Sequence, residues 1–309
     1  MRRIGLSLLA ALLLAACARE GLAGANVYPQ GAEGFWMGAA PPPGFYYVNY
    51  NLYYNARRFT DNSGRTIRQG PMADFKMDVL AQVSRFLYMS DKEILGANWG
   101  AHIFLIFQQV HIRSAGGNSR ASGLGDTIID PFILAWHWEN LHITTGIDIY
   151  LPTGNYREGR LANLSANAFV YEPVLAVTYM TPVEGLTASA KFMYDFPQKN
   201  KDFTNPFTGE SGTLAYGEEF HFDYSLDYMI NENLKAGLSG YYYQQITKDR
   251  FNGVSIPEKG RVWALGPGFE YAPERLEGRM VVSLRSQFEM DAKNRPEGWS
   301  NWLRAVWVF

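Results

Sequence analysis

Apolar and polar residues alternate along most of this 309-residue chain, in about a dozen segments. In one of them, Leu141 and Ile143 alternate with His142 and Thr144. A period of two is that of a β-strand, because successive side chains point to opposite faces. Segments with apolar residues on one face and charges on the other predict the strands of a transmembrane β-barrel, with lipid outside and water inside.

The alternation predicts twelve strands, an even number as in single-chain bacterial barrels. Short turns, such as 139–140 and 231–233, are expected to face the periplasm, and longer loops, such as 153–162, 198–213 and 291–298, to face outward. A soluble β-sandwich is the alternative, but its strands usually have about five or six residues. The expected strands are 44–57, 71–89, 98–112, 124–138, 141–152, 163–180, 185–197, 214–230, 233–247, 261–272, 276–290 and 299–309. We expect bulges at Pro131 and Pro173, because proline removes a ladder donor.

The chain ends within an apolar stripe, on Phe309. Leu303, Ala305 and Trp307 lie on the same face of the expected last strand. In a closed barrel this strand pairs with the first, which is expected to begin near Gly44, so that no edge stays open. An aromatic carboxy-terminal residue of this kind resembles the insertion signal of outer-membrane proteins, so the barrel-assembly machinery is the expected partner of Phe309.

The amino-terminal segment, residues 1–18, has the features of a secretory signal peptide: Arg2 and Arg3 precede an apolar run. The run is too short to cross a bilayer as a helix. Residues 14–17 also match a lipobox, in which Cys17 would carry the lipid, whereas cleavage after Ala18 or near residues 23–25 would remove it. Cys17 is the only cysteine, which excludes an internal disulfide.

Residues 19–43 differ in kind from the rest, which is expected to form the barrel over residues 44–309. They contain glycines, Phe35 and Trp36, and end in the stiff run Pro41-Pro-Pro43. This stretch is expected to be either a periplasmic tether or a plug that folds into the lumen, with Phe35 and Trp36 lining a path for an aromatic or aliphatic ligand.

Composition agrees with a membrane barrel. Aromatic residues make up 15% of the chain, enough for girdles at both membrane interfaces. The net charge is −2 and no polybasic run occurs, so no nucleic-acid partner is expected. Both signs of charge are expected in the lumen, which argues against strong ion selectivity. Each lumen-facing candidate is either a solvated or salt-bridged wall residue or a ligand contact: Asp74, Lys76, Asp78, His142, Asp148, Lys191, Asp195, Asp223, Asp227, Lys235, Arg279, Arg285 and Arg304.

Four stretches resemble the outer-membrane family named for the meta-pathway of phenol degradation: residues 26–35, 41–46, 123–137 with Gly-Leu-Gly-Asp, and 146–154. The resemblance extends over nearly the whole mature chain. It implies an outer-membrane barrel of a Gram-negative bacterium, surrounded by outer-membrane lipid and associated with uptake of small hydrophobic or aromatic compounds. The expected third strand, with an unbroken apolar run at 103–107, would suit an apolar solute.

Two other functions fit a twelve-stranded barrel. A lipid hydrolase needs a serine beside a histidine, usually on the outer face, but His142 lacks such a serine and His221 is expected to point inward. An adhesive or structural barrel should carry longer outer loops. The five histidines show no metal-ligand spacing, and no cofactor is expected. A channel without enzymatic activity is therefore the predicted function.

Overall fold

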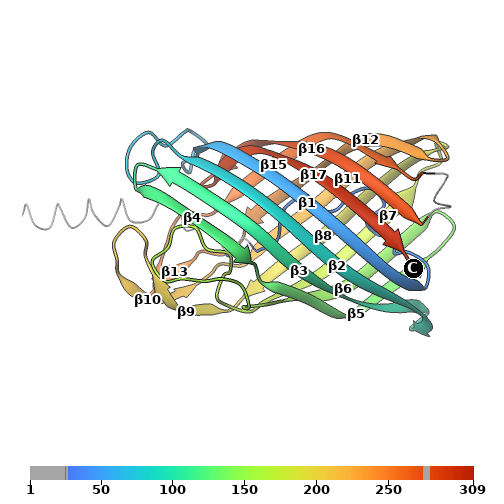
Figure 1. Cartoon of the computed structure of the whole chain (residues 1–309), viewed down its shortest axis with the longest axis horizontal. Coiled ribbons are helices and arrows are strands. Elements are labelled where there is room, and N and C mark those ends of the chain that lie inside the picture. Colours follow the sequence, from blue (N-terminus) through green and yellow to red (C-terminus); the bar gives the residue numbers. More distant parts are fainter. Residues whose placement is uncertain (1–24, 26, 274–278) are drawn as a thin grey trace, which may run out of the picture.

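The computed structural model of the protein describes residues 25, 27–273 and 279–309. Its main sheet contains thirteen strands, of which twelve form a closed antiparallel barrel, as predicted (Figure 1). Within the described ranges, no helix has the length and hydropathy of a membrane span. The predicted signal peptide and Cys17 lie outside the described residues. The barrel strands are β1 (Gly44–Phe59), β2 (Lys76–Ile94), β3 (Ala97–Ser114), β5 (Thr127–His137), β6 (Leu141–Leu151), β7 (Val170–Met180), β8 (Leu186–Pro197), β11 (Glu219–Asn231), β12 (Leu234–Gln245), β15 (Arg261–Tyr271), β16 (Met280–Lys293) and β17 (Pro296–Val308).

The first and last strands close the barrel. β1 pairs with β2 on one side and with β17 on the other, where Tyr46 faces Val308 and Tyr47 faces Trp307. Beyond β17, the Phe309 backbone N–H donates a hydrogen bond to the Phe45 carbonyl at 3.1 Å. Every barrel strand therefore has two neighbours, and the expected pairing of the last strand with the strand that begins at Gly44 is confirmed.

Removing Phe309 should impair assembly of the barrel while export continues. Its side chain is 81% exposed and its backbone makes one hydrogen bond, so little folding energy depends on it. An assembly defect on deletion would therefore indicate that the barrel-assembly machinery recognises Phe309. The measurement compares heat-modifiable barrel in outer membranes with total exported protein, and normal outer-membrane levels of the shortened chain would contradict the role.

The two ends of the barrel differ. One, the loop end, carries the long connections. There β3 continues into a hairpin with β4 (Gly117–Leu124). A separate small sheet at this end contains β9 (Lys199–Thr204), β10 (Ser211–Ala215), β13 (Arg250–Phe251) and β14 (Val254–Ser255). The other, the short-turn end, holds the C-terminus (Figure 1). The predicted outer loop at 291–298 is wrong: β16 and β17 meet in a tight turn, with Asn294 at a φ of 51°.

Strand β5 contains a bulge next to Pro131. Its pairing with β6 shifts between Ile129 and Leu134, and buried positions change from Ile128 and Asp130 to Ile133. The expected bulge at Pro131 is thus confirmed, because proline cannot donate to the ladder and is tolerated where pairing is interrupted. The expected bulge at Pro173 is wrong, since β7 keeps its register with β6 through that residue.

Candidate functional site: the barrel lumen and its leader

Residues 25 and 27–43, which we term the leader, lie inside the barrel. Near the loop half of the lumen, Ala25 and Val27 pack against a wall cluster that includes Val48 and Tyr50. Near the short-turn end, Ala40 packs against a second wall cluster around Leu87. The leader therefore follows the barrel axis and joins β1 at the short-turn end.

Asp223 on β11 is a main anchor of the leader. Its carboxylate accepts hydrogen bonds from the Tyr28 hydroxyl at 2.8 Å and from the backbone N–H groups of Gly31 at 3.0 Å and Glu33 at 3.1 Å. From β16, Arg285 donates to the carbonyls of Gly31 at 3.1 Å and Ala32 at 2.8 Å. These charge-assisted bonds are buried and stronger than neutral ones, so they fix this turn of the leader against the wall.

Glu33 is the leader's only acidic residue in the described part of the chain, and it faces three cations of the wall. Its carboxylate lies 3.2 Å from the Lys191 ammonium, 3.8 Å from the Arg85 guanidinium and 4.0 Å from that of Arg304. All four side chains are less than one-fifth exposed. Because buried charges need partners, this cluster ties the leader to β2, β8 and β17 at once.

The aromatic pair of the leader, buried Phe35 and half-buried Trp36, follows Glu33 toward the short-turn end. Trp36 donates from Nε1 to Asp227 at 3.2 Å, and the Lys235 ammonium lies 3.8 Å from its ring centre. Phe35 is 3% exposed. Gly38 donates to the Thr178 hydroxyl at 2.9 Å, and a Cβ at Gly38 would lie 2.5 Å from the Val177 backbone. Only glycine allows the leader to approach β7 this closely.

Nine of the thirteen predicted lumen residues have side chains on the inward face of their strands. His142 is at the rim, where its Nδ1 lies 2.9 Å from that of His137. Asp195 lies with His221 and Asp148 with His102. The nine are His142, Asp148, Lys191, Asp195, Asp223, Asp227, Lys235, Arg285 and Arg304.

The other four predictions were wrong. Asp74 is exposed in the loop before β2, with a φ of 54°. Lys76 and Asp78 point outward near the loop end, where Asp78 pairs with Arg57. Arg279 is exposed in the turn before β16. On β2 the error is one of parity: the face that carries Met77, Val79 and Val83 is turned to the lumen, and the face that carries Lys76 and Asp78 is turned outward.

The inward and outward faces of β2 are the reverse of those expected from the sequence, and Arg85 is the residue that indicates this. Arg85, the one charged residue on the apolar face, points inward to Glu33, whereas Leu80 and Phe86 on the other face are about half exposed to lipid. The lone charge in an otherwise apolar stripe was the available signal. Other inward residues that had not been identified are Glu33, His102, Asp130, Glu172, Glu219 and Glu270.

An apolar vestibule occupies the loop half of the lumen. This cavity has a volume of about 430 Å³ and continues toward a narrower one of about 30 Å³ beside Tyr28 and Ala32. Below that, the leader and its charged cluster lie in the lumen. Apolar side chains of β1, β2, β3 and the loops form most of its lining, among them Phe59, Met72, Phe75, Val79, Val110 and Leu164. Polar side chains, among them Asp126, Arg160 and Glu289, complete the lining.

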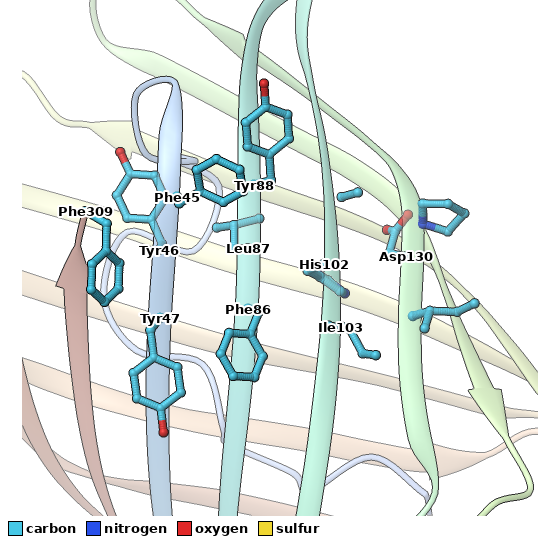
Figure 2. A pocket seen from close by; sticks show the side chains of 13 residues that line it. Phe45, Tyr46, Tyr47, Phe86, Leu87, Tyr88, His102, Ile103, Asp130 and Phe309 are labelled. Atoms are coloured by element: carbon cyan, nitrogen blue, oxygen red, sulfur yellow. The ribbon is translucent and has the colours of Figure 1, made fainter.

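The outer surface carries aromatic residues at the short-turn end. Figure 2 shows Phe45 and Tyr47 on β1, Phe86 and Tyr88 on β2, and Phe309, around a groove of about 700 Å³ that extends to Pro131. Phe45 and Tyr88 lie with ring centres 4.6 Å apart. Aromatic side chains that face lipid at a barrel rim are typical of an interfacial girdle, which sets the membrane level at this end.

An apolar outer band, a closed ladder and a filled polar lumen define an outer-membrane β-barrel of Gram-negative bacteria. The chain belongs to the family described as "Putative MetA-pathway of phenol degradation", whose profile matches residues 56–305. This confirms the family predicted from the sequence. No curated protein sequence matches the chain.

Solved structures of outer-membrane proteins share this fold, and two of them show how far the similarity extends. The COG4313 outer membrane channel from Pseudomonas putida F1 superposes with a TM-score of 0.78 at 16% identity, covering 90% of this chain and 99% of that one. The translocator domain of the autotransporter NalP from Neisseria meningitidis gives a TM-score of 0.54 at 11% identity, covering 88% and 91%. At these identities the comparisons establish a common barrel architecture.

Proposed function

We propose that this protein is an outer-membrane channel through which small hydrophobic or aromatic compounds enter the cell. The observation that carries the proposal is the apolar vestibule at the loop end. A purely aqueous pore would present polar side chains all around its wall, whereas most of this wall is apolar: Val79 and Val110 face each other across the β2–β3 pair and point into the lumen. The Pseudomonas putida protein that shares this fold is an outer membrane channel, which agrees with this proposal.

The size and chemistry of the vestibule suit such a solute. Its volume of about 430 Å³ is within the range of about 300–1,000 Å³ in which small molecules bind. Transfer of apolar surface from water contributes roughly 25 cal/mol per Å². The vestibule would therefore concentrate an aromatic ring from water at the point where the lipopolysaccharide leaflet slows its direct passage.

The leader is the second part of the proposed mechanism. It fills the lumen below the vestibule, with the Glu33 cluster between the vestibule and the short-turn end. A solute that reaches the periplasm must pass beside the leader or displace it. We therefore propose that residues 26–43 are a plug whose anchors limit passage, and that lumen charges such as Asp223 and Lys191 hold the plug.

We propose no enzymatic role. The lipid-hydrolase alternative needs a histidine paired with a serine. In the described residues these histidines bond to other groups: His102 to Asp148, His137 to His142, and His221 to Asp195. Since His102 and His221 are also turned into the lumen, lipid could not reach them. A lipid-hydrolysis assay on the purified barrel tests this assignment, and turnover would contradict it.

Replacing Val79 and Val110 together with threonine should lower the uptake of aromatic and aliphatic solutes. Threonine has nearly the shape of valine, so the cavity stays while two hydroxyls make its wall polar. The measurement is uptake of a solute panel into cells that lack the protein, carry it, or carry the double variant. A small sugar in the same panel reports whether the pore as a whole has changed.

The matched control is the double variant Val79→Ile and Val110→Ile, which keeps the wall apolar. It should retain preference for apolar solutes even if the narrower cavity slows them. The channel proposal fails if cells with and without the protein take up the whole panel equally. The proposed role of the vestibule fails if the threonine and isoleucine double variants, at equal barrel levels, take up apolar solutes equally well.

A further inference from the structure

Three ligand-type side chains meet on the inner wall apart from the vestibule. Glu172 on β7, Asp195 on β8 and His221 on β11 are each fully buried, and one ligand atom from each lies within 4.8 Å of the others. His221 Nε2 is 3.3 Å from Glu172 Oε2 and 3.2 Å from Asp195 Oδ2. Because β7, β8 and β11 are consecutive strands of the barrel, the wall holds this spacing rigidly.

Hydrogen bonds within the protein leave this group incomplete. A single ring nitrogen faces two carboxylates, and one N–H cannot donate well to both. Glu172 Oε1, Asp195 Oδ1 and His221 Nδ1 are buried without a hydrogen-bond partner. Buried polar atoms are nearly always paired, and a buried carboxylate without a partner is costly, so these side chains call for a cation that the three groups share.

The spacing fits a metal ion. Zinc binds nitrogen and carboxylate oxygen at about 2.0–2.2 Å, and two ligands at that distance with an angle of about 100° lie about 3.2 Å apart. We propose that Glu172, Asp195 and His221 form a binding site for a divalent transition-metal ion, with Zn²⁺ the best match to one imidazole and two carboxylates. A divalent ion with a neutral imidazole would balance the two carboxylate charges, and water or a second carboxylate oxygen would complete the coordination.

The surroundings support the orientation of these ligands. The Tyr150 hydroxyl donates to Glu172 Oε2 at 3.1 Å, and the rings of Tyr28 and Tyr243 lie 4.9 Å and 6.4 Å from that of His221. Partners of this kind hold metal ligands in place. Tyr28 belongs to the leader and donates to Asp223, two residues beyond His221 on the same strand. A bound ion would thus join three strands directly behind the leader's main anchor.

A second group, His102 with Asp130 and Asp148, is a weaker candidate. The Arg85 guanidinium donates to His102 Nδ1 at 2.9 Å, and His102 Nε2 lies 2.7 Å from Asp148. Its histidine is therefore already paired on both nitrogens, one of them with the Arg85 guanidinium, and has no nitrogen left for a metal ion. This difference singles out the His221 group.

The test uses the full barrel, folded in detergent, stripped with a chelator, exposed to Zn²⁺ and dialysed. Metal content by mass spectrometry, the visible spectrum after loading with Co²⁺, and the unfolding temperature with and without Zn²⁺ are measured. The variants are His221→Gln and Asp195→Asn. His102→Gln removes the other buried histidine, His142→Gln removes one of the rim pair, and heat-modifiable migration shows that each variant folds.

We expect the wild-type barrel and both control variants to retain a single Zn²⁺ ion and to unfold at a higher temperature with it. His221→Gln and Asp195→Asn should lose the ion and the shift together. Two results would overturn the site. One is a folded wild-type barrel that retains no Zn²⁺, in which case Glu172, Asp195 and His221 are a buried ionic cluster only. The other is metal that persists in His221→Gln and disappears in His102→Gln or His142→Gln.

Discussion

Deletion of residues 26–40 should raise the single-channel conductance of the barrel several-fold. The leader occupies the lumen along the barrel axis, and its anchors Tyr28, Glu33 and Trp36 all lie within the deleted stretch. A twelve-stranded barrel without a plug leaves space for water and ions beside its wall side chains. We therefore expect the leader, and not the strands, to limit the passage of ions.

Planar-bilayer recordings of the wild-type and shortened barrels measure this effect, with heat-modifiable migration confirming that both are folded. Phe35→Leu is the matched control, since it keeps the leader's length, anchors and apolar contact. Its conductance should stay close to the wild-type value. Equal conductance of wild-type and shortened barrels would contradict the plug and leave the tether as the role of this stretch.

The barrel was predictable because lipid imposes one rule on every strand. Outward positions must be apolar, so Leu226 and Tyr228 alternate with inward Asp223 and Asp227, and the parity of β11 follows directly. Strand number and closure follow from the same alternation and from the position of Phe309. Boundaries at the loop end were less accurate, because strands there extend beyond the membrane and no longer obey the lipid rule.

The parity of β2 could not be derived in this way. Its lumen face is more apolar than its outer face, where Lys76, Asp78, Gln82 and Ser84 alternate with the lumen-facing Val79 and Val83. Alternation shows which face is the more apolar, and it gives the wrong parity where that face is turned to the lumen. At such a position the apolar wall of the vestibule replaces the usual pattern of polar residues inward and apolar residues outward. Arg85 is the residue that indicates the true inward side.

The contacts of the leader were beyond sequence reasoning for a different reason. Glu33 meets Lys191, 158 residues further along the chain, because the closed barrel brings distant strands around a central segment. No local pattern encodes which inward charge faces which leader residue. The sequence indicated most of the charged wall residues and the aromatic pair, and only the three-dimensional structure joins them into anchors.

Glu33→Gln should lower the free energy of unfolding by about 3–5 kcal/mol, the usual effect of breaking a buried ion pair. Its carboxylate is the shared partner of Lys191, Arg85 and Arg304, so an amide leaves three cations close together in a place shielded from water. Urea-induced unfolding of the barrel in lipid vesicles measures the loss. Because the leader would be held less firmly, the same variant should also raise conductance, though less than the deletion does.

A double-mutant cycle separates this charge cluster from a general loss of packing. Adding Lys191→Met to Glu33→Gln removes one of the stranded cations, so the double variant should lose less stability than the two single variants together. Asp78→Asn is the matched carboxylate-to-amide control: it pairs with the exposed Arg57 on the outer face and should change stability by under about 1 kcal/mol. The proposed role of Glu33 would be contradicted by strictly additive losses of unfolding free energy, or by a loss in Asp78→Asn as large as that in Glu33→Gln. Either result would mean that Glu33 does not act through the wall cations. The leader would then be held mainly by Asp223 and Arg285.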